Sequence, residues 1–212
     1  FMFFVVLVFL LVLFVLNYFL LFLDLTCGSV MFRPPRSKKI RVRGLHSLGK
    51  KQEKILAKTI TEADPELALS TLKNSTYSAF LIGQQAAASM LSMDREDNDH
   101  LGSIIFTNAS AAFKGYPRSG AFAMASHGKS GLAQSMAREL MPQGIHVVHV
   151  PIDAAIGWTQ EDGVRRHRLA GDSENDNMAD PDKIAETYLH LHRQHKSTWT
   201  FEAIVRPWTE TW

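Results

Sequence analysis

The 212-residue sequence lacks the cysteine and glycine patterns that two large classes of site require. Its single cysteine, Cys27, excludes an intrachain disulfide and a thiolate metal site. No G-x-G-x-x-G or Gly-x-x-x-Gly-x-Gly pattern precedes Asp64, although such a turn holds the pyrophosphate of a dinucleotide. Residues 32–64 are also too few for two βαβ units of roughly 30 residues each. We therefore expect an α/β domain that is truncated on its N-terminal side, and the first residue, Phe1, also indicates a fragment.

Charged side chains are absent from residues 2–23, where only Asn17 and Tyr18 interrupt an apolar run. A helix of this length spans roughly 33 Å, which is enough for a bilayer core. A cleaved signal peptide fits less well because no basic leader precedes the run and the run is too long. The alternative is a soluble helix that is buried on every side. We predict a hydrophobic, membrane-spanning segment over residues 1–30.

Acidic residues are scarce in the segment that follows. Residues 33–58 contain ten Lys or Arg but only one acidic residue, Glu53. The net charge of +2 for the whole sequence therefore conceals a strongly basic block. The positive-inside rule places such a block on the cytoplasmic side, where anionic lipid can contact it. No aromatic residues are interleaved to stack on bases, so no nucleic acid partner is expected. We predict a basic linker over residues 31–63 and a single-pass, membrane-attached protein, or a cytoplasmic one if translation starts at Met31.

The remaining residues, 64–212, alternate helix and strand patterns. Asp64 and Asp180 each precede a proline, which is typical of a helix start, and Gly144 ends a helix that begins near Ser119. The apolar, β-branched runs at 103–106 and 145–150 predict strands, and TFEAIVRP at 200–207 predicts another. Strands separated by helices form a parallel sheet through right-handed crossovers. The fold class is therefore α/β, with a three-layer α/β/α Rossmann-like parallel sheet preceded by a hydrophobic helix.

The stretch GSIIFTNASAAFKGYPRSGAFAMASHGKSGLAQSMARELMPQGIHVVHV, residues 102–150, resembles the C-terminal half of a short-chain dehydrogenase/reductase. In that family a Ser follows the strand and a Tyr-x-x-x-Lys pair opens the next helix. Ser110 matches the Ser, whereas Phe122 stands at the Tyr position and Ser126 at the Lys position. The closing segments DPDKIAETYLHLHRQ and FEAIVRPW resemble a subgroup of the same family. The motif is degenerate, because Phe122 has no exchangeable proton and Ser126 carries no charge.

The resemblance implies roles for three further features. Asn74, in the helix predicted after Asp64, would complete the catalytic set with Ser110, and Ile156 would lie beside the nicotinamide of NAD or NADP. In the family the helices that correspond to residues 65–93 and 119–141 form a dimer. The resemblance therefore implies an NAD(P)-dependent oxidoreductase for a carbonyl or hydroxyl substrate, with catalysis impaired here. The alternative is a non-catalytic dimerisation module held at a membrane.

Other polar residues offer weaker sites. Lys129 returns to the helical face of Phe122, but about 10 Å along the axis, which favours a surface lysine. Tyr116 lies in the loop after Ser110 and could replace the missing proton donor. His190, His192 and His195 are spaced for a surface helix rather than for zinc, so no metal site is predicted.

Overall fold

Two buried parallel strands form the centre of the computed structural model, which describes residues 29–32, 58–93, 100–167 and 170–211. Strand β2 (Gly102–Ala109) pairs in parallel with β3 (Ile145–Ile152) along its whole length, and every residue of both strands is buried. Both strands are β-branched and apolar because helices cover both faces, as is usual for a parallel sheet. The predicted α/β fold with a parallel Rossmann-like sheet is confirmed.

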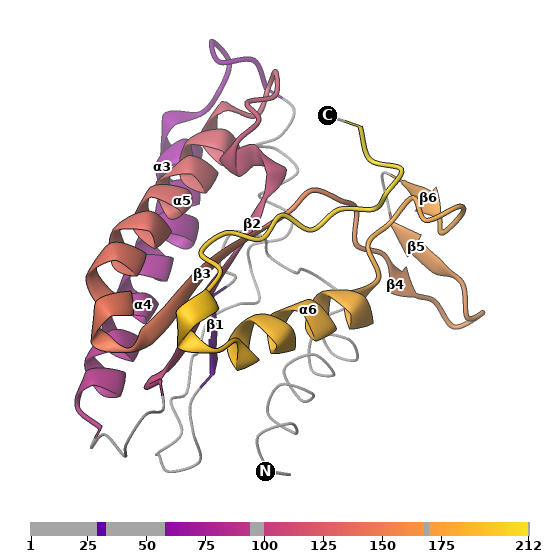
Figure 1. Ribbon diagram of the computed structural model, residues 1–212. Helices are drawn as coiled ribbons and strands as arrows, with labels where there is room; N and C mark the ends of the chain where they lie inside the picture. Colours follow the sequence, from indigo (N-terminus) through magenta and orange to yellow (C-terminus); the bar gives the residue numbers. More distant parts are fainter. Residues whose placement is uncertain (1–28, 33–57, 94–99, 168–169, 212) are drawn as a thin grey trace.

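One face of the sheet is covered by three helical elements (Figure 1). They are α3 (Pro65–Leu72), α4 (Ser78–Leu91) and α5 (Gly120–Leu140), and a π-helical turn, η1 (Lys73–Tyr77), joins the first two. Small residues such as Ala79 and Ala133, both fully buried, let the helices pack closely on Ile104 and Phe106. The predicted cap is present, since Asp64 Oδ1 accepts a hydrogen bond of 3.0 Å from the Glu66 amide. Gly144 ends the α5 region with φ of 90°.

The opposite face is covered by α6 (Pro181–Arg193). Its side chains Ile184, Tyr188 and Leu191 pack on Ile105 and Val148 in a second apolar cluster. Asp180 caps this helix by accepting from the amides of Asp182 and Lys183, as the Asp-Pro pattern predicts. The sheet is thus the middle layer of three.

The sheet has two edges that the sequence did not predict correctly. Strand β1 (Ser29–Phe32) pairs antiparallel with β2, so the predicted boundary between residues 30 and 31 falls inside a strand. On the other side the expected strand at 200–207 forms only two isolated parallel bridges, His149 to Glu202 and Ile152 to Val205.

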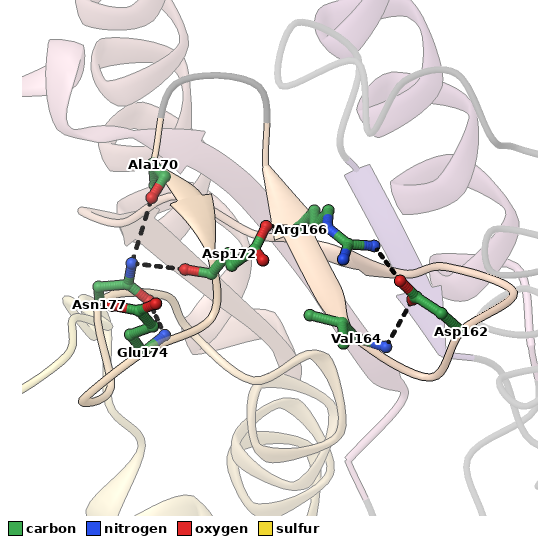
Figure 2. A network of polar contacts seen from close by, with 7 residues as sticks. All are labelled: Asp162, Val164, Arg166, Ala170, Asp172, Glu174 and Asn177. Carbon is green, nitrogen blue, oxygen red and sulfur yellow. Dashed lines mark hydrogen bonds and ion pairs between the residues drawn. The ribbon is translucent and has the colours of Figure 1, made fainter.

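A small antiparallel sheet is inserted between β3 and α6. It comprises β4 (Trp158–Thr159), β5 (Arg165–His167) and β6 (Gly171–Asp172). Arg166 joins it internally, with ion pairs of 2.7 Å to Asp162 and 2.8 Å to Asp172, and the Asn177 amide binds the carbonyls of Ala170 and Asp172 (Figure 2). Arg166 is therefore paired with two carboxylates of this insert.

The hydrophobic segment 1–30 and the basic linker 31–63 fall almost wholly outside the described residues. Among the residues that are described, no helix combines the length and the apolar character needed to cross a bilayer.

Candidate active site

The candidate catalytic residues gather where β2 ends and α5 begins. Ser110 opens a short 3-10 turn, η2 (Ser110–Ala112), and is half-buried, and its carbonyl accepts from the amides of Phe113 and Lys114. Phe122 and Ser126 lie on the first two turns of α5. The order strand, hydroxyl, helix therefore puts Ser110 at the carboxyl end of the sheet, the edge at which open α/β sheets bind ligands.

Ser126 faces the protein interior and is 2% exposed. Its backbone carbonyl accepts a hydrogen bond of 2.9 Å from the Asn108 side chain, and the preceding carbonyl, of Ala125, accepts one of 2.7 Å from Thr76 Oγ1. The turn η1 can approach α5 this closely because residue 128 is glycine, where a Cβ would lie 3.0 Å from Thr76 Oγ1. The position that the sequence resemblance assigns to the family's lysine thus lies inside the protein and holds a neutral side chain.

Asn74 lies in the π-helical turn, a feature that is often found at functional sites. The side-chain amide of Asn74 donates to Ser70 Oγ at 3.3 Å, and its backbone carbonyl accepts from Ser78 Oγ at 2.6 Å. Within the described ranges no hydrogen bond joins it to Ser110. Its neighbour Ser75, rather than Asn74, is the buried residue of this turn. The catalytic role of Asn74 therefore stays a prediction.

Ile156 lies beyond the end of β3 and is half-buried. It forms a parallel bridge with Ala179 and packs on the apolar cluster under α6. Nothing in these contacts tests the predicted position beside a nicotinamide ring.

The prediction that Lys129 is a surface residue is wrong. Its side chain is 0% exposed and its ammonium donates to the Thr107 carbonyl at 3.3 Å. The signal was available, because position 129 continues the stripe of Ala125, Ala133 and Met136 that α5 buries. The ammonium therefore contacts β2 at Thr107, two residues before the strand ends.

Asp153 is a charged residue of this edge that the sequence did not identify as important. It is 3% exposed, its Oδ2 lies 2.8 Å from the Lys114 ammonium and 3.6 Å from the Arg206 guanidinium, and its amide donates to the Val205 carbonyl. The hydrogen bond to Asp153 raises the pKa of Lys114. Asp153 therefore ties the loop after Ser110 and the C-terminal segment to the end of β3.

Two other predictions concern loop and helix residues. Tyr116 is 48% exposed in the loop before α5, and its role as a substitute proton donor stays a prediction. His192, expected on a surface helix, is half-buried and its Nδ1 lies 3.0 Å from Ser103 Oγ. Within the described ranges, no three His, Cys, Asp or Glu side chains are grouped closely enough to hold a metal ion.

The N-termini of α3 and α6 do not fit the pyrophosphate of a dinucleotide. A helix that binds phosphate presents free backbone amides and no acidic side chain at its first turn. The first turns of α3 and α6 instead carry the carboxylates of Asp64 and Asp180, which already accept from those amides, and Glu66 and Asp182 add further negative charge. Across the parts of the chain that the structure describes, no glycine-rich turn joins a strand to a helix.

Similarity to known proteins follows the same outline. A family model described as enoyl-(acyl carrier protein) reductase matches residues 43–206. Comparison with functionally curated proteins found no match. A short-chain dehydrogenase from Rhodopseudomonas palustris is 31% identical, with a TM-score of 0.53, and the match covers 72% of this chain and 57% of that one.

Two further solved structures contain a nicotinamide cofactor. One is a metagenomic short-chain oxidoreductase in complex with NADP, with 22% identity, a TM-score of 0.51 and coverage of 72% of this chain and 57% of the other. The second is a 4-hydroxyisoleucine dehydrogenase complexed with NADH, with 15% identity, a TM-score of 0.54 and coverage of 73% and 64%. The chain thus spans about three fifths of the length of these structures. With a family model matched over most of its residues, and with the strand–hydroxyl–helix order in place, the chain belongs to the short-chain dehydrogenase/reductase family.

Proposed function

We propose that this chain forms the substrate side of an NAD(P)-dependent oxidoreductase site that has lost its proton-transfer pair. The observation that supports this proposal is the ordered geometry at the start of α5. Ser110 keeps the hydroxyl that would bind a carbonyl oxygen, whereas Phe122 and Ser126 occupy the positions of the acid and of the cation that lowers its pKa. Loss of a general acid typically costs about 10² to 10⁴ in rate.

Turnover by the full chain tests the proposal. Purified chain mixed with NADH or NADPH and a panel of small aldehydes and ketones should oxidise neither coenzyme above the rate without protein. Titration calorimetry should show no micromolar affinity for either dinucleotide, because the described ranges contain no glycine-rich turn between a strand and a helix. Micromolar binding, or turnover that depends on the carbonyl substrate, would contradict the proposal.

A chimera isolates the proton-transfer pair. We would join residues 102–212 to the complete cofactor half of a family member and introduce Phe122→Tyr with Ser126→Lys. The double change should raise turnover by about two orders of magnitude or more, the scale of general acid catalysis, and each single change by much less. High activity with Phe122 and Ser126 unchanged would show another donor, and Tyr116→Phe would then identify or exclude Tyr116.

A second candidate function is a non-catalytic interaction module. An open groove of about 650 Å³ lies on the outer face of the helices and is lined almost entirely by apolar side chains. Leu69, Tyr77 and Phe80 on its rim are 44%, 56% and 41% exposed. Because large contiguous apolar patches mark interfaces, this face supports the homodimer predicted through helices 65–93 and 119–141.

We further propose that residues 2–23 and the basic linker attach this module to anionic membrane, with the domain on the cytoplasmic side. Support comes from the sequence alone, namely the uncharged run followed by ten basic residues. Cells that express the full chain and a version starting at Met31 would be fractionated after a high-salt wash. Only the full chain should sediment with membranes, and equal recovery of both in the soluble fraction would remove this proposal.

A further inference from the structure

The C-terminal strap, residues 199–206, lies along the outer edge of β3 and is fastened by histidines. Four backbone hydrogen bonds of 2.7–3.0 Å link it to β3 and to Asp153. From the strap, the amides of Ala203 and Val205 donate to the carbonyls of His149 and Pro151. In return, the amides of His149 and Asp153 donate to the carbonyls of Phe201 and Val205. The strap is therefore a short edge element held by few backbone bonds, the kind that opens locally before a protein unfolds.

His149 lies under the middle of the strap, and its hydrogen bonds fit the neutral ring. Asn108 Oδ1 accepts from the Ala109 amide, so its Nδ2 faces His149 Nε2 at 3.0 Å and donates to it. Nε2 is then an acceptor, and Nδ1 carries the hydrogen that it donates to Glu202 Oε2 at 2.7 Å. A proton on Nε2 would point at the Asn108 Nδ2 group, which is also a donor, in a site where His149 is 1% exposed.

His146 fastens the beginning of the strap. Its Nε2 donates to the Thr200 carbonyl at 2.9 Å, and its ring stacks on Trp199 with a centroid distance of 4.8 Å and an interplanar angle of 2°. His100 packs edge-on against Trp199 at 5.8 Å and against His192 at 5.4 Å. Two imidazoles thus contact the indole ring of Trp199, and a third, that of His192, contacts His100. Positive charge on His100 disfavours charge on His146 and on His192.

The charged and titratable neighbours of these imidazoles come from every packed element. His149 faces Glu202 on the strap and Lys129 on α5, while His146 faces His100 and His192, and Arg193 lies beside His192. Glu202 is the single acid of this set, and its side chain is 42% exposed. Cations therefore predominate around the fastening.

The far end of the strap is held differently. Arg206 lies 3.6 Å from Asp153, and Trp208 beyond it donates from its indole nitrogen to Asp176 Oδ2 at 3.0 Å. Neither contact involves an imidazole. The two ends of the strap should therefore respond differently to pH.

From this geometry we propose that the strap is an acid-operated clasp, in which residues 199–203 leave β3 on mild acidification while Val205 and Arg206 stay attached. Opening frees the outer edge of β3 from His146 to His149. The buried core of β2, β3 and α5 contains the remaining contacts and stays folded.

The sign of the pH dependence follows from burial. Burial lowers the pKa of His146 and of His149 and lowers that of His192 to about 4. A histidine whose folded pKa is depressed stabilises the closed state fully above its ordinary pKa near 6.5, and this stabilisation is lost as pH falls toward the folded value. The clasp is thus closed at neutral pH and opens increasingly below about pH 6.

Amide hydrogen exchange of the full chain, resolved by residue and corrected for intrinsic rates, tests the clasp at pH 7 and pH 5. The amides of Ala203 and His149 should lose protection by on the order of tenfold at pH 5. The amides of Asp153, of Val205 and of residues 104–107 should keep theirs. Equal protection of Ala203 at both pH values, or uniform loss across all elements, would overturn the proposal.

Variants that cannot titrate provide the matched comparison. Glutamine can donate and accept at the same places, so His146→Gln with His149→Gln should leave Ala203 equally protected at the two pH values. His190→Gln, on the exposed side of α6, is the control and should open as the parent does. Acid opening that persists unchanged in the double variant would contradict the assignment to these imidazoles. The parent comparison decides the proposal even if the double variant loosens the strap at both pH values.

Discussion

The side chain of Asn108, at the end of β2, donates a hydrogen bond of 2.9 Å to the backbone carbonyl of Ser126 on α5. The bond joins the sheet to the helix turn on which the family carries its lysine. Asn108 is 0% exposed, donates its second amide hydrogen to His149 and accepts from the Ala109 amide. It therefore holds the candidate site together without entering its chemistry.

Asn108→Ala should destabilise the protein strongly. The change removes the side-chain partner of three buried groups, and a buried group left unsatisfied costs roughly 1 to 3 kcal/mol, so we expect a loss of about 2 kcal/mol or more. Asn74→Ala is the matched control, because Asn74 makes one side-chain bond of 3.3 Å and is only half-buried. Urea unfolding measures both. A loss below about 1 kcal/mol for Asn108→Ala would show that water replaces its bonds.

Lys129→Met should be neutral or stabilising. Replacing a buried charge by an apolar side chain of similar length commonly gains up to about 1–4 kcal/mol, because the desolvation cost of the charge is removed. The control, Lys183→Met, lies on the surface of α6, where the lysine is 71% exposed, and should change stability by less than about 0.5 kcal/mol. Thermal and urea unfolding give the comparison. Marked destabilisation of Lys129→Met would indicate that the ammonium bonds outweigh its burial.

Gly157→Ala and Gly131→Ala should act in opposite directions. A Cβ at 157 would lie 2.6 Å from Met178 Sδ and 3.0 Å from the Arg166 carbonyl, so backbone must shift, and we expect a loss of about 1–3 kcal/mol. A Cβ at 131 meets nothing within 4 Å, and alanine is favoured inside a helix by about 0.5–1 kcal/mol. Unfolding midpoints that move in the same direction for both variants would contradict the packing around the insert.

Tyr188 should titrate only at strongly alkaline pH. Burial raises the pKa of Tyr188 to about 12, and its hydroxyl lies 2.7 Å from Thr107 Oγ1. Because the pKa of Tyr188 is higher in the folded protein, the neutral tyrosine stabilises the fold fully below its ordinary pKa near 10. This stabilisation is lost as pH rises through the pKa of the folded state. Tyrosinate absorbance should show one late step, coincident with alkaline unfolding, that Tyr188→Phe removes. Loss of the same absorbance in Tyr188→Phe well below pH 11, while the protein is still folded, would contradict it.

Phe80→Glu should weaken self-association of the full chain. Phe80 borders the apolar groove on the helices, so a carboxylate there would be buried between copies. Val164→Glu is the control, since Val164 has similar exposure, 36%, but lies on the β4–β5 turn. Sedimentation velocity should show dimers for the parent and the control and monomers for Phe80→Glu. Dimers that persist in Phe80→Glu would move the interface away from this face.

The sequence predicted the elements whose signals are local. Asp64-Pro65 and Asp180-Pro181 mark the helix starts, and the apolar runs of β2 and β3 mark buried strands, as the structure confirms. It failed where a contact depends on distant residues. Lys129 looks like a surface lysine unless the helix is known to bury that stripe, and Asp153 acquires its importance only from Lys114 and Arg206.

Strand β1 has a consequence for any cofactor half that is supplied from elsewhere. Its residues Ser29–Phe32 use the backbone groups of β2 from Ser103 to Phe106, on the side opposite β3. A parallel strand from a partner would need the same row of amides and carbonyls, so the two are mutually exclusive. Complementation would therefore be a displacement reaction, and its rate would be set by how fast residues 29–32 leave the sheet and not by diffusion of the two parts.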